Sequence, residues 1–252
     1  MFKDIKQVMK DSVLYGIGNV AVKLVGFILI PLYTDAEYFS TADYGLMGLL
    51  EVTSQILIAV MGLSLYSGLI RWYWDAEYRD KQKTIFFTTL LFTILTSLCI
   101  GSVLWLNVGE LSALLVQQEG YSLGGELPYI LQLLILTSML GAVVEVPQNL
   151  LRLQRKPIYY SLTNIVRLFA TLVLTIYFTI SLHRGVSGVY EAQLVGIVIQ
   201  LFMVLPLVIK NSSCRVDRKC TIQLLAYSYP LVFPAIVGSL LTVFDRYIIN
   251  HF

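Results

Sequence analysis

The sequence predicts an all-α integral membrane protein, built as a polytopic bundle of membrane-spanning helices. Of the 252 residues, 57% are hydrophobic and only 13% are charged, about half the charged share of soluble domains. A helix needs roughly 20 apolar residues to cross the hydrocarbon core of a bilayer. Seven segments meet this requirement, and their apolar runs are continuous, unlike the alternating strands of a membrane barrel. The predicted spans are 12–33, 44–70, 84–107, 128–150, 158–181, 187–209 and 224–248.

Lysine and arginine are concentrated on one side of these spans. Fourteen of the 18 lie in the N-terminal segment and in every second loop, whereas the opposite loops contain only Arg184. Because cytoplasmic loops carry an excess of Lys and Arg, the N-terminus is predicted to be cytoplasmic. The first span is too long for a signal peptide and is predicted to remain as an uncleaved helix. The fourteen residues are Lys3, Lys6, Lys10, Arg71, Arg79, Lys81, Lys83, Arg152, Arg155, Lys156, Lys210, Arg215, Arg218 and Lys219.

A short internal repeat divides the chain after six spans. Moving the seventh span back by 212 positions aligns Tyr227 with Tyr15, and three further identical pairs follow. Since many transporters consist of two related halves, we predict a six-helix N-terminal lobe at 1–210, a cytoplasmic loop at 211–223 and the start of a second lobe at 224–252. We expect the chain to end one helix into that truncated lobe; an intact seven-helix protein is the alternative. The further pairs are Val20 with Val232, Val25 with Val237 and Gly26 with Gly238.

A charged residue inside a span costs about 2.5–3.5 kcal/mol at the bilayer centre and therefore marks a candidate transport pathway, and six such residues stand out. Lys23 and Arg167 are expected near the midplane. Glu51 is expected nearer the outside and Glu145 nearer the cytoplasm. The other two, at the outer end of the seventh span, are Asp245 and Arg246.

Polar residues in three spans recur at three- or four-residue steps, which places them on one face of each helix. The first, second and fifth spans are therefore predicted to line one net cationic cleft, which suits an anionic group such as a pyrophosphate. In the alternative, Lys23 or Arg167 pairs with Glu51 or Glu145 and holds the helices together, or small-residue faces simply permit close packing. The residues concerned are Asn19 and Lys23, Glu51 and Gln55, and Asn164 and Arg167.

The sequence contains no phosphate-binding loop, no zinc-protease motif and no C-x-x-C pair. The two histidines lie at span ends without a companion that would complete a metal site, and the three cysteines are predicted to be free thiols. We therefore expect no catalytic residues, no metal, no cofactor and no nucleic-acid partner.

Several short motifs occur in a fixed order along the chain. They are Gly26-Phe27, Pro31-Leu32-Tyr33-Thr34, Asp43-Tyr44-Gly45, Gly62-Leu63-Ser64, Arg71-Trp72-Tyr73, Tyr229-Pro230-Leu231 and Asp245-Arg246-Tyr247-Ile248-Ile249. With these motifs the sequence resembles the N-terminal half of the polysaccharide biosynthesis flippases, the Wzx-type O-antigen and lipid-linked oligosaccharide flippases of the MOP exporter superfamily. It departs from that pattern at Thr41-Ala42, where the family often has a proline.

The resemblance implies a MATE-like lobe that moves a polyprenyl-diphosphate-linked oligosaccharide from the cytoplasmic to the outer leaflet of the bacterial inner membrane. The implied mechanism is alternating access during surface polysaccharide (lipopolysaccharide) biosynthesis. The implied partners are the lipid-linked oligosaccharide, membrane lipids and the polysaccharide polymerase machinery. Substrate-binding roles are expected for Lys23, Arg167, Asn19 and Asn164, and coupling or gating roles for Glu51, Gln55, Glu145, Asp245 and Arg246.

Three other interpretations remain open. A drug or metabolite exporter of the same superfamily would depend on acidic residues and would transport cationic compounds. A membrane glycosyltransferase or polymerase normally needs a sizeable loop or domain to bind its sugar donor, and the predicted loops are short. A truncated protein that no longer transports is the third.

Overall fold

The computed structural model describes residues 27–35, 37–116, 125–213, 215–238 and 240–241. The regular elements of this part of the chain are all helical, which confirms the predicted all-α membrane fold. Six helices are long and apolar enough to cross a membrane, and they match the second to seventh predicted spans. They are Thr41–Gly62, Tyr78–Leu106, Leu127–Leu153, Pro157–Ser181, Gly185–Asn211 and Arg218–Gly238. The first predicted span, 12–33, lies largely outside the described residues, although 27–33 are helical.

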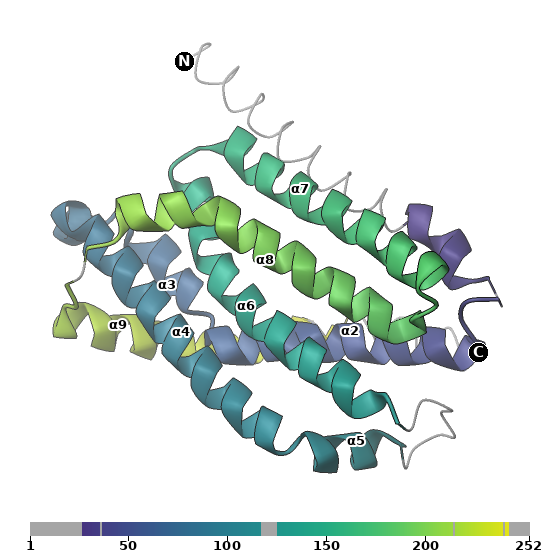
Figure 1. Cartoon of the computed structure of the whole chain (residues 1–252). Coiled ribbons are helices and arrows are strands. Elements are labelled where there is room, and N and C mark those ends of the chain that lie inside the picture. The colour runs from purple at the N-terminus through teal and green to yellow at the C-terminus, as the bar shows by residue number, and fades with distance from the viewer. Residues whose placement is uncertain (1–26, 36, 117–124, 214, 239, 242–252) are drawn as a thin grey trace.

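The helix α6 (Leu127–Leu153) is the centre of the bundle, and more than half of its apolar membrane-spanning stretch is buried. It packs against three long helices, and α7 in turn packs along α8 at the edge of the bundle (Figure 1). A short helix, α5 (Val108–Val116), occupies part of the predicted connection 108–127. The other long helices are α2 (Thr41–Gly62), α4 (Gln82–Leu106), α7 (Pro157–Ile176), which ends in the π-helical turn η2 (Tyr177–Ser181), and α8 (Gly185–Asn211).

Two apolar clusters fill the bundle. The first joins α2, α6 and α8 through buried residues that include Leu46, Leu50, Leu134 and Tyr190. The second joins α3 (Leu65–Trp72), α4, α6 and α9 (Arg218–Ser228) through residues that include Leu69, Phe86, Leu150 and Leu224. The buried apolar residues thus form two clusters, one towards each end of the bundle.

Polar contacts between loops show that one end of the bundle gathers the basic loops. The amide of Gln154 donates to the Tyr73 hydroxyl at 3.2 Å and to Asn211 Oδ1 at 2.8 Å. Lys81 forms an ion pair with Asp217 at the same end. We call this the basic end; its cytoplasmic location stays a prediction from the positive-inside rule.

The second predicted span, 44–70, is not one helix. The backbone at Leu63 and Ser64 is left-handed, with φ of 46° and 48°, so α2 ends at Gly62 and α3 begins at Leu65. A break inside a membrane leaves backbone carbonyls that need other donors. The Thr96 hydroxyl of α4 lies 2.7 Å from the Met61 carbonyl oxygen, immediately before the break.

Replacing Thr96 with valine should therefore destabilise the protein. The change keeps the shape of the side chain and removes the donor near the Met61 carbonyl, at an expected cost of about 0.5–1.5 kcal/mol. Thr93 is the matched control, because its buried hydroxyl has no hydrogen-bond partner. Equilibrium unfolding in mixed detergent should show a loss for Thr96→Val and none for Thr93→Val; equal losses would contradict this account.

The predicted cytoplasmic loop, 211–223, is shorter in the structure because α9 begins at Arg218. The Asp217 side chain caps this helix by accepting from the backbone N–H groups of Lys219 and Cys220, as Asp commonly does at helix starts. Four residues along this helix are buried, namely Cys220, Thr221, Leu224 and Ser228. The helix passes through a 3₁₀ turn, η3 (Tyr229–Leu231), and continues over 232–238. The division into lobes at 1–210 and 224–252 stays a prediction.

Candidate functional site

A cavity of about 350 Å³ lies where the broken helix pair α2–α3 faces α6 and the helical segment 232–238. Its polar lining groups include Gln55 of α2, Ser64 at the break, Tyr66 of α3 and Glu145 of α6. Gly238 lines it from the segment that follows α9. Irregular backbone is tolerated inside a membrane where it is buried in protein or lines a cavity, and the α2–α3 break meets that condition. The volume is within the range of small-ligand sites.

Glu145 gives this cavity a carboxylate. It lies in the second half of α6, where its side chain is half-buried. It interacts electrostatically with Tyr66 and with Arg152, which is about two turns further along the helix. No Lys or Arg of the described residues lines the cavity. Its described lining is therefore acidic, and Lys23, on which the predicted cationic cleft depends, lies outside the described residues.

Arg167 lies in a second polar group, between α7 and α8. Its guanidinium donates to Gln200 Oε1 at 3.1 Å, and the Gln200 amide donates to Asn164 Oδ1 at 3.0 Å. The Asn164 amide in turn donates to the Tyr160 carbonyl oxygen at 2.9 Å. This series of hydrogen bonds fixes the orientation of the Gln200 and Asn164 amides and engages one nitrogen of the Arg167 guanidinium. We call Arg167, Gln200 and Asn164 the arginine relay.

The backbones of α7 and α8 approach closely beside the arginine relay. A Cβ atom at Gly196 would lie 2.1 Å from Thr171 Oγ1 and 3.3 Å from the Arg167 carbonyl oxygen. Gln200 is one turn further along α8 and only 1% exposed. Glycine at this position lets α8 carry Gln200 within hydrogen-bond distance of Arg167, so the relay is supported by rigid helix packing.

Glu51 lies one turn before Gln55 on α2, at an exposed position. The Gln55 amide donates to Glu51 Oε1 at 3.3 Å, which connects Glu51 to a residue of the cavity. Glu51 also interacts electrostatically with Arg167, at longer range than an ion pair, and with Tyr33 and Tyr190. The bond to Gln55 thus places Glu51 beside the lining of the cavity.

The structure brings together some of the predicted site residues and separates others. Gln55 and Glu145 line the cavity, with Glu51 beside Gln55. Arg167 and Asn164 face α8, where Gln200 accepts from one nitrogen of Arg167 and donates to Asn164, so these contacts connect α7 with α8. The predicted residues Lys23, Asn19, Asp245 and Arg246 lie outside the described residues.

Two residues of the site were not among the predicted ones. Gln200 is an amide in the apolar middle of the sixth predicted span. Because a buried amide requires hydrogen-bond partners, its position could have indicated that it belongs to a polar site. Tyr66 follows the helix break, whose position the sequence did not indicate. Its place in the cavity depends on the turn at Leu63 and Ser64.

No family model and no curated protein matches the sequence. Solved transporter structures match it over nearly its whole length. A MATE structure in the straight conformation gives a TM-score of 0.75 at 18% identity and covers 98% of this chain and 55% of that one. A MOP-superfamily transporter from Pyrococcus furiosus, described by a reversed polarity of its binding pocket, gives 0.74 at 19% identity with the same coverage.

A third structure is an outward-facing multidrug resistance MATE transporter of the MOP superfamily, with a TM-score of 0.73 at 18% identity. It too is covered over 55% of its length, so the chain spans about half of the solved transporters that it matches. At these identities the likeness establishes the fold. The chain is a multi-pass membrane protein with the fold of the N-terminal half of a MOP-superfamily transporter.

Proposed function

We propose that the protein transports a polyprenyl-diphosphate-linked oligosaccharide from the cytoplasmic to the outer leaflet of the bacterial inner membrane, with Arg167 binding the diphosphate. The MOP transporter fold supports the transport class, and the sequence motifs listed above support this substrate. The lipid-linked oligosaccharide is the primary partner, and the polymerase machinery that uses it is a second. Alternating access between the two faces is the proposed mechanism.

The observation that carries the proposal is the environment of Arg167. Among the described residues no carboxylate lies within ion-pair distance of its guanidinium, and its direct side-chain partner is the neutral amide of Gln200. A cation inside a membrane bundle is expensive unless it is paired or functional. A guanidinium presents five N–H donors in a planar fork that suits phosphate oxygens. Gln200 accepts a hydrogen bond from one guanidinium nitrogen. Because Gln200 is neutral, it leaves the positive charge of Arg167 uncompensated at contact distance.

The acidic cavity favours a second candidate function, export of a cationic compound. Glu145 and Gln55 would bind an amine or a quaternary nitrogen within a volume of about 350 Å³. Charge complementarity between a cavity and its ligand gives specificity, so this candidate requires Glu145 and not Arg167. The two candidates use different residues and can be separated by experiment.

The test is complementation of two bacterial strains with the full-length gene. One strain lacks its lipid-linked oligosaccharide flippase, and the other lacks its exporters of cationic dyes. Our proposal predicts restored surface polysaccharide in the first strain and unchanged dye resistance in the second. Dye resistance without polysaccharide, together with its loss in Glu145→Gln, would overturn the proposal in favour of the second candidate.

A further inference from the structure

Arg152 lies at the basic end, in the last turn of α6, where uncharged groups of α6 and α7 hold its guanidinium. The guanidinium donates a hydrogen bond to the Tyr160 hydroxyl, and its central carbon lies 4.6 Å from the centre of the Tyr160 ring. A weaker contact of 3.5 Å joins it to Asn149 Oδ1. Among the described residues no carboxylate lies within ion-pair distance of Arg152, so no contact compensates its positive charge.

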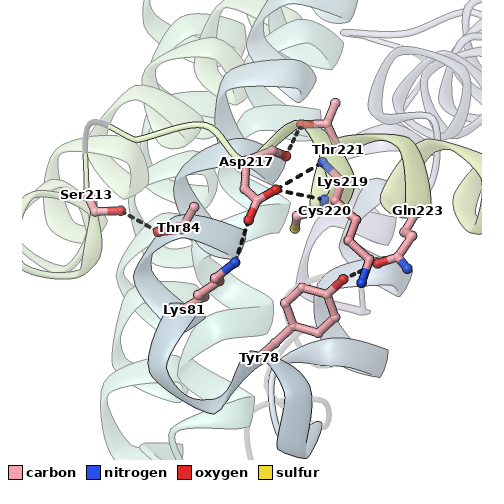
Figure 2. Close-up of polar contacts among 9 residues, drawn as sticks. All are labelled: Tyr78, Lys81, Thr84, Ser213, Asp217, Lys219, Cys220, Thr221 and Gln223. Carbon is pink, nitrogen blue, oxygen red and sulfur yellow. Dashed lines mark hydrogen bonds and ion pairs between the residues drawn. The ribbon is translucent and has the colours of Figure 1, made fainter.

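Another cation of the basic end is paired with a carboxylate instead. Figure 2 shows Lys81, the last residue of η1 (Ala76–Lys81), with its ammonium 2.7 Å from Asp217 Oδ2. A guanidinium has five N–H donors, and the described contacts of Arg152 use two of them. The remaining donors and the charge of Arg152 are therefore available to an anionic ligand.

Tyr160 orients Arg152 without neutralising it, because a guanidinium is attracted to the face of an aromatic ring. The surrounding interface between α6 and α7 is hydrogen-bonded as well. The Thr163 hydroxyl and the Asn164 amide each donate to the Tyr160 carbonyl oxygen at 2.9 Å. The Gln148 amide of α6 donates to the Thr163 hydroxyl, also at 2.9 Å. Arg152 is thus held on packed helices, and a side chain that is already oriented loses less entropy when a ligand binds.

Arg152 lies on the basic-end side of the cavity. It interacts electrostatically with Tyr66 and with Glu145, and both of these residues line the cavity. Glu145 precedes it by about two turns of α6 and so lies roughly 10 Å deeper along the helix axis. The side chain of Arg152 is exposed. A ligand that approaches the cavity from the basic end can therefore meet Arg152 before it meets the cavity lining.

Tyr160 and Arg167 lie on the same face of α7, because they are separated by about two helical turns, or roughly 10 Å. Asn164 of the arginine relay lies between them, and its amide donates to the Tyr160 carbonyl oxygen. Arg152, held at Tyr160, and Arg167 are therefore placed at two depths along one polar face, with Arg152 nearer the basic end. Two cations in this arrangement can bind the same anion one after the other.

We propose that Arg152 is a second phosphate-binding residue of the transporter, which binds the diphosphate of the lipid-linked oligosaccharide at the basic end before the diphosphate reaches Arg167. Tyr160 is a positioning residue, because it acts through Arg152. The inference rests on the proposed function and deepens it by naming the first site that the substrate meets. The phosphate of an anionic phospholipid has the same chemistry, so the experiment separates these two sources.

Equilibrium binding to the purified full-length protein tests this role, with radiolabelled polyprenyl diphosphate in detergent as the probe. The parent is measured first, and the variants are then made in an Arg167→Gln background, so that the deeper cation does not contribute. Arg152→Gln is added to this background. The matched control adds Arg155→Gln instead, which makes the same substitution at an exposed residue of the basic end, three positions away.

We expect the Arg167→Gln background to bind the probe and Arg152→Gln to weaken that binding at least about fivefold, a moderate effect for a charged hydrogen bond because the site is exposed. Arg155→Gln should bind like the background. Tyr160→Phe keeps the ring and removes the hydroxyl, so it should weaken binding about twofold. If Tyr160 acts through Arg152, Tyr160→Phe should have no further effect in the Arg152→Gln protein, whereas a merely structural role would weaken binding in both.

The role of Arg152 is overturned, and the proposed function left intact, if Arg152→Gln does not weaken binding or if only the parent binds the probe. No binding by the parent would overturn both. Displacement of the probe by an equal amount of phosphatidylglycerol would show a general site for anionic phospholipids and overturn the assignment to the substrate. If Arg152→Gln does not fold, Arg152→Lys keeps the charge and loses the planar fork, and unchanged binding by that variant would overturn the proposal.

Discussion

Replacing Arg167 with glutamine should reduce polysaccharide export by about tenfold to a hundredfold. Loss of a charged hydrogen bond costs about 1.5–3 kcal/mol, and each 1.4 kcal/mol corresponds to a factor of ten in affinity. Glutamine removes the charge but keeps a donor for Gln200 Oε1, which Arg167 now bonds at 3.1 Å. The measurement is surface polysaccharide in a flippase-deficient strain, normalised to the amount of transporter in the membrane.

Two companion variants separate charge from folding. Arg167→Lys keeps the positive charge without the planar fork and should retain more export than Arg167→Gln. Arg79→Gln makes the same substitution at an exposed residue of η1 and should leave export unchanged. Full export by a membrane-inserted Arg167→Gln protein would contradict the proposed role of this guanidinium.

Gln200→Glu should abolish most transport while the protein stays folded. A glutamate carboxylate would place an oxygen where Gln200 Oε1 now accepts from Arg167. It would therefore form a direct ion pair with the Arg167 guanidinium. That pair would neutralise the charge proposed to bind the diphosphate. We expect a loss similar to that of Arg167→Gln, measured by the same export assay.

The control for Gln200→Glu is Gln193→Glu, which makes the same chemical change two turns earlier on α8, at a half-buried position. It should export normally. Thermal melting in detergent distinguishes charge neutralisation from unfolding. Gln200→Glu keeps a bond to Arg167 and loses its donation to Asn164, so it should melt below the parent but above Gln200→Leu, which loses both buried partners. Normal export by a folded Gln200→Glu protein would show that the charge of Arg167 is not needed.

The long apolar spans were predictable because a membrane helix must satisfy all its backbone hydrogen bonds within itself and needs a minimum length. The break at Leu63 and Ser64 was not, because neither residue is glycine or proline and left-handed backbone is rare for both. It is supported by tertiary contacts such as that of Thr96 with the Met61 carbonyl. Such contacts are not visible in the sequence of one span.

Several residues of the candidate site were predictable, but their grouping was not. Gln55 and Glu145 were singled out because they are polar inside spans, yet their shared cavity depends on how α2, α3 and α6 pack. Periodicity placed Asn164 and Arg167 on one face of their helix. It could not show that α8 covers this face, because the choice of neighbour depends on the glycine at 196 and the amide at 200.

The central claim is that this fold moves an anionic lipid-linked oligosaccharide with the help of Arg167. The most direct measurement uses proteoliposomes of the full-length protein loaded with a polyprenyl-diphosphate-linked oligosaccharide, in which a lectin added outside detects the sugar that reaches the outer leaflet. We predict that the lectin-accessible fraction rises with time for the parent and rises at least about tenfold more slowly for Arg167→Gln. No rise with the parent, or an equal rise with Arg167→Gln, would contradict the account.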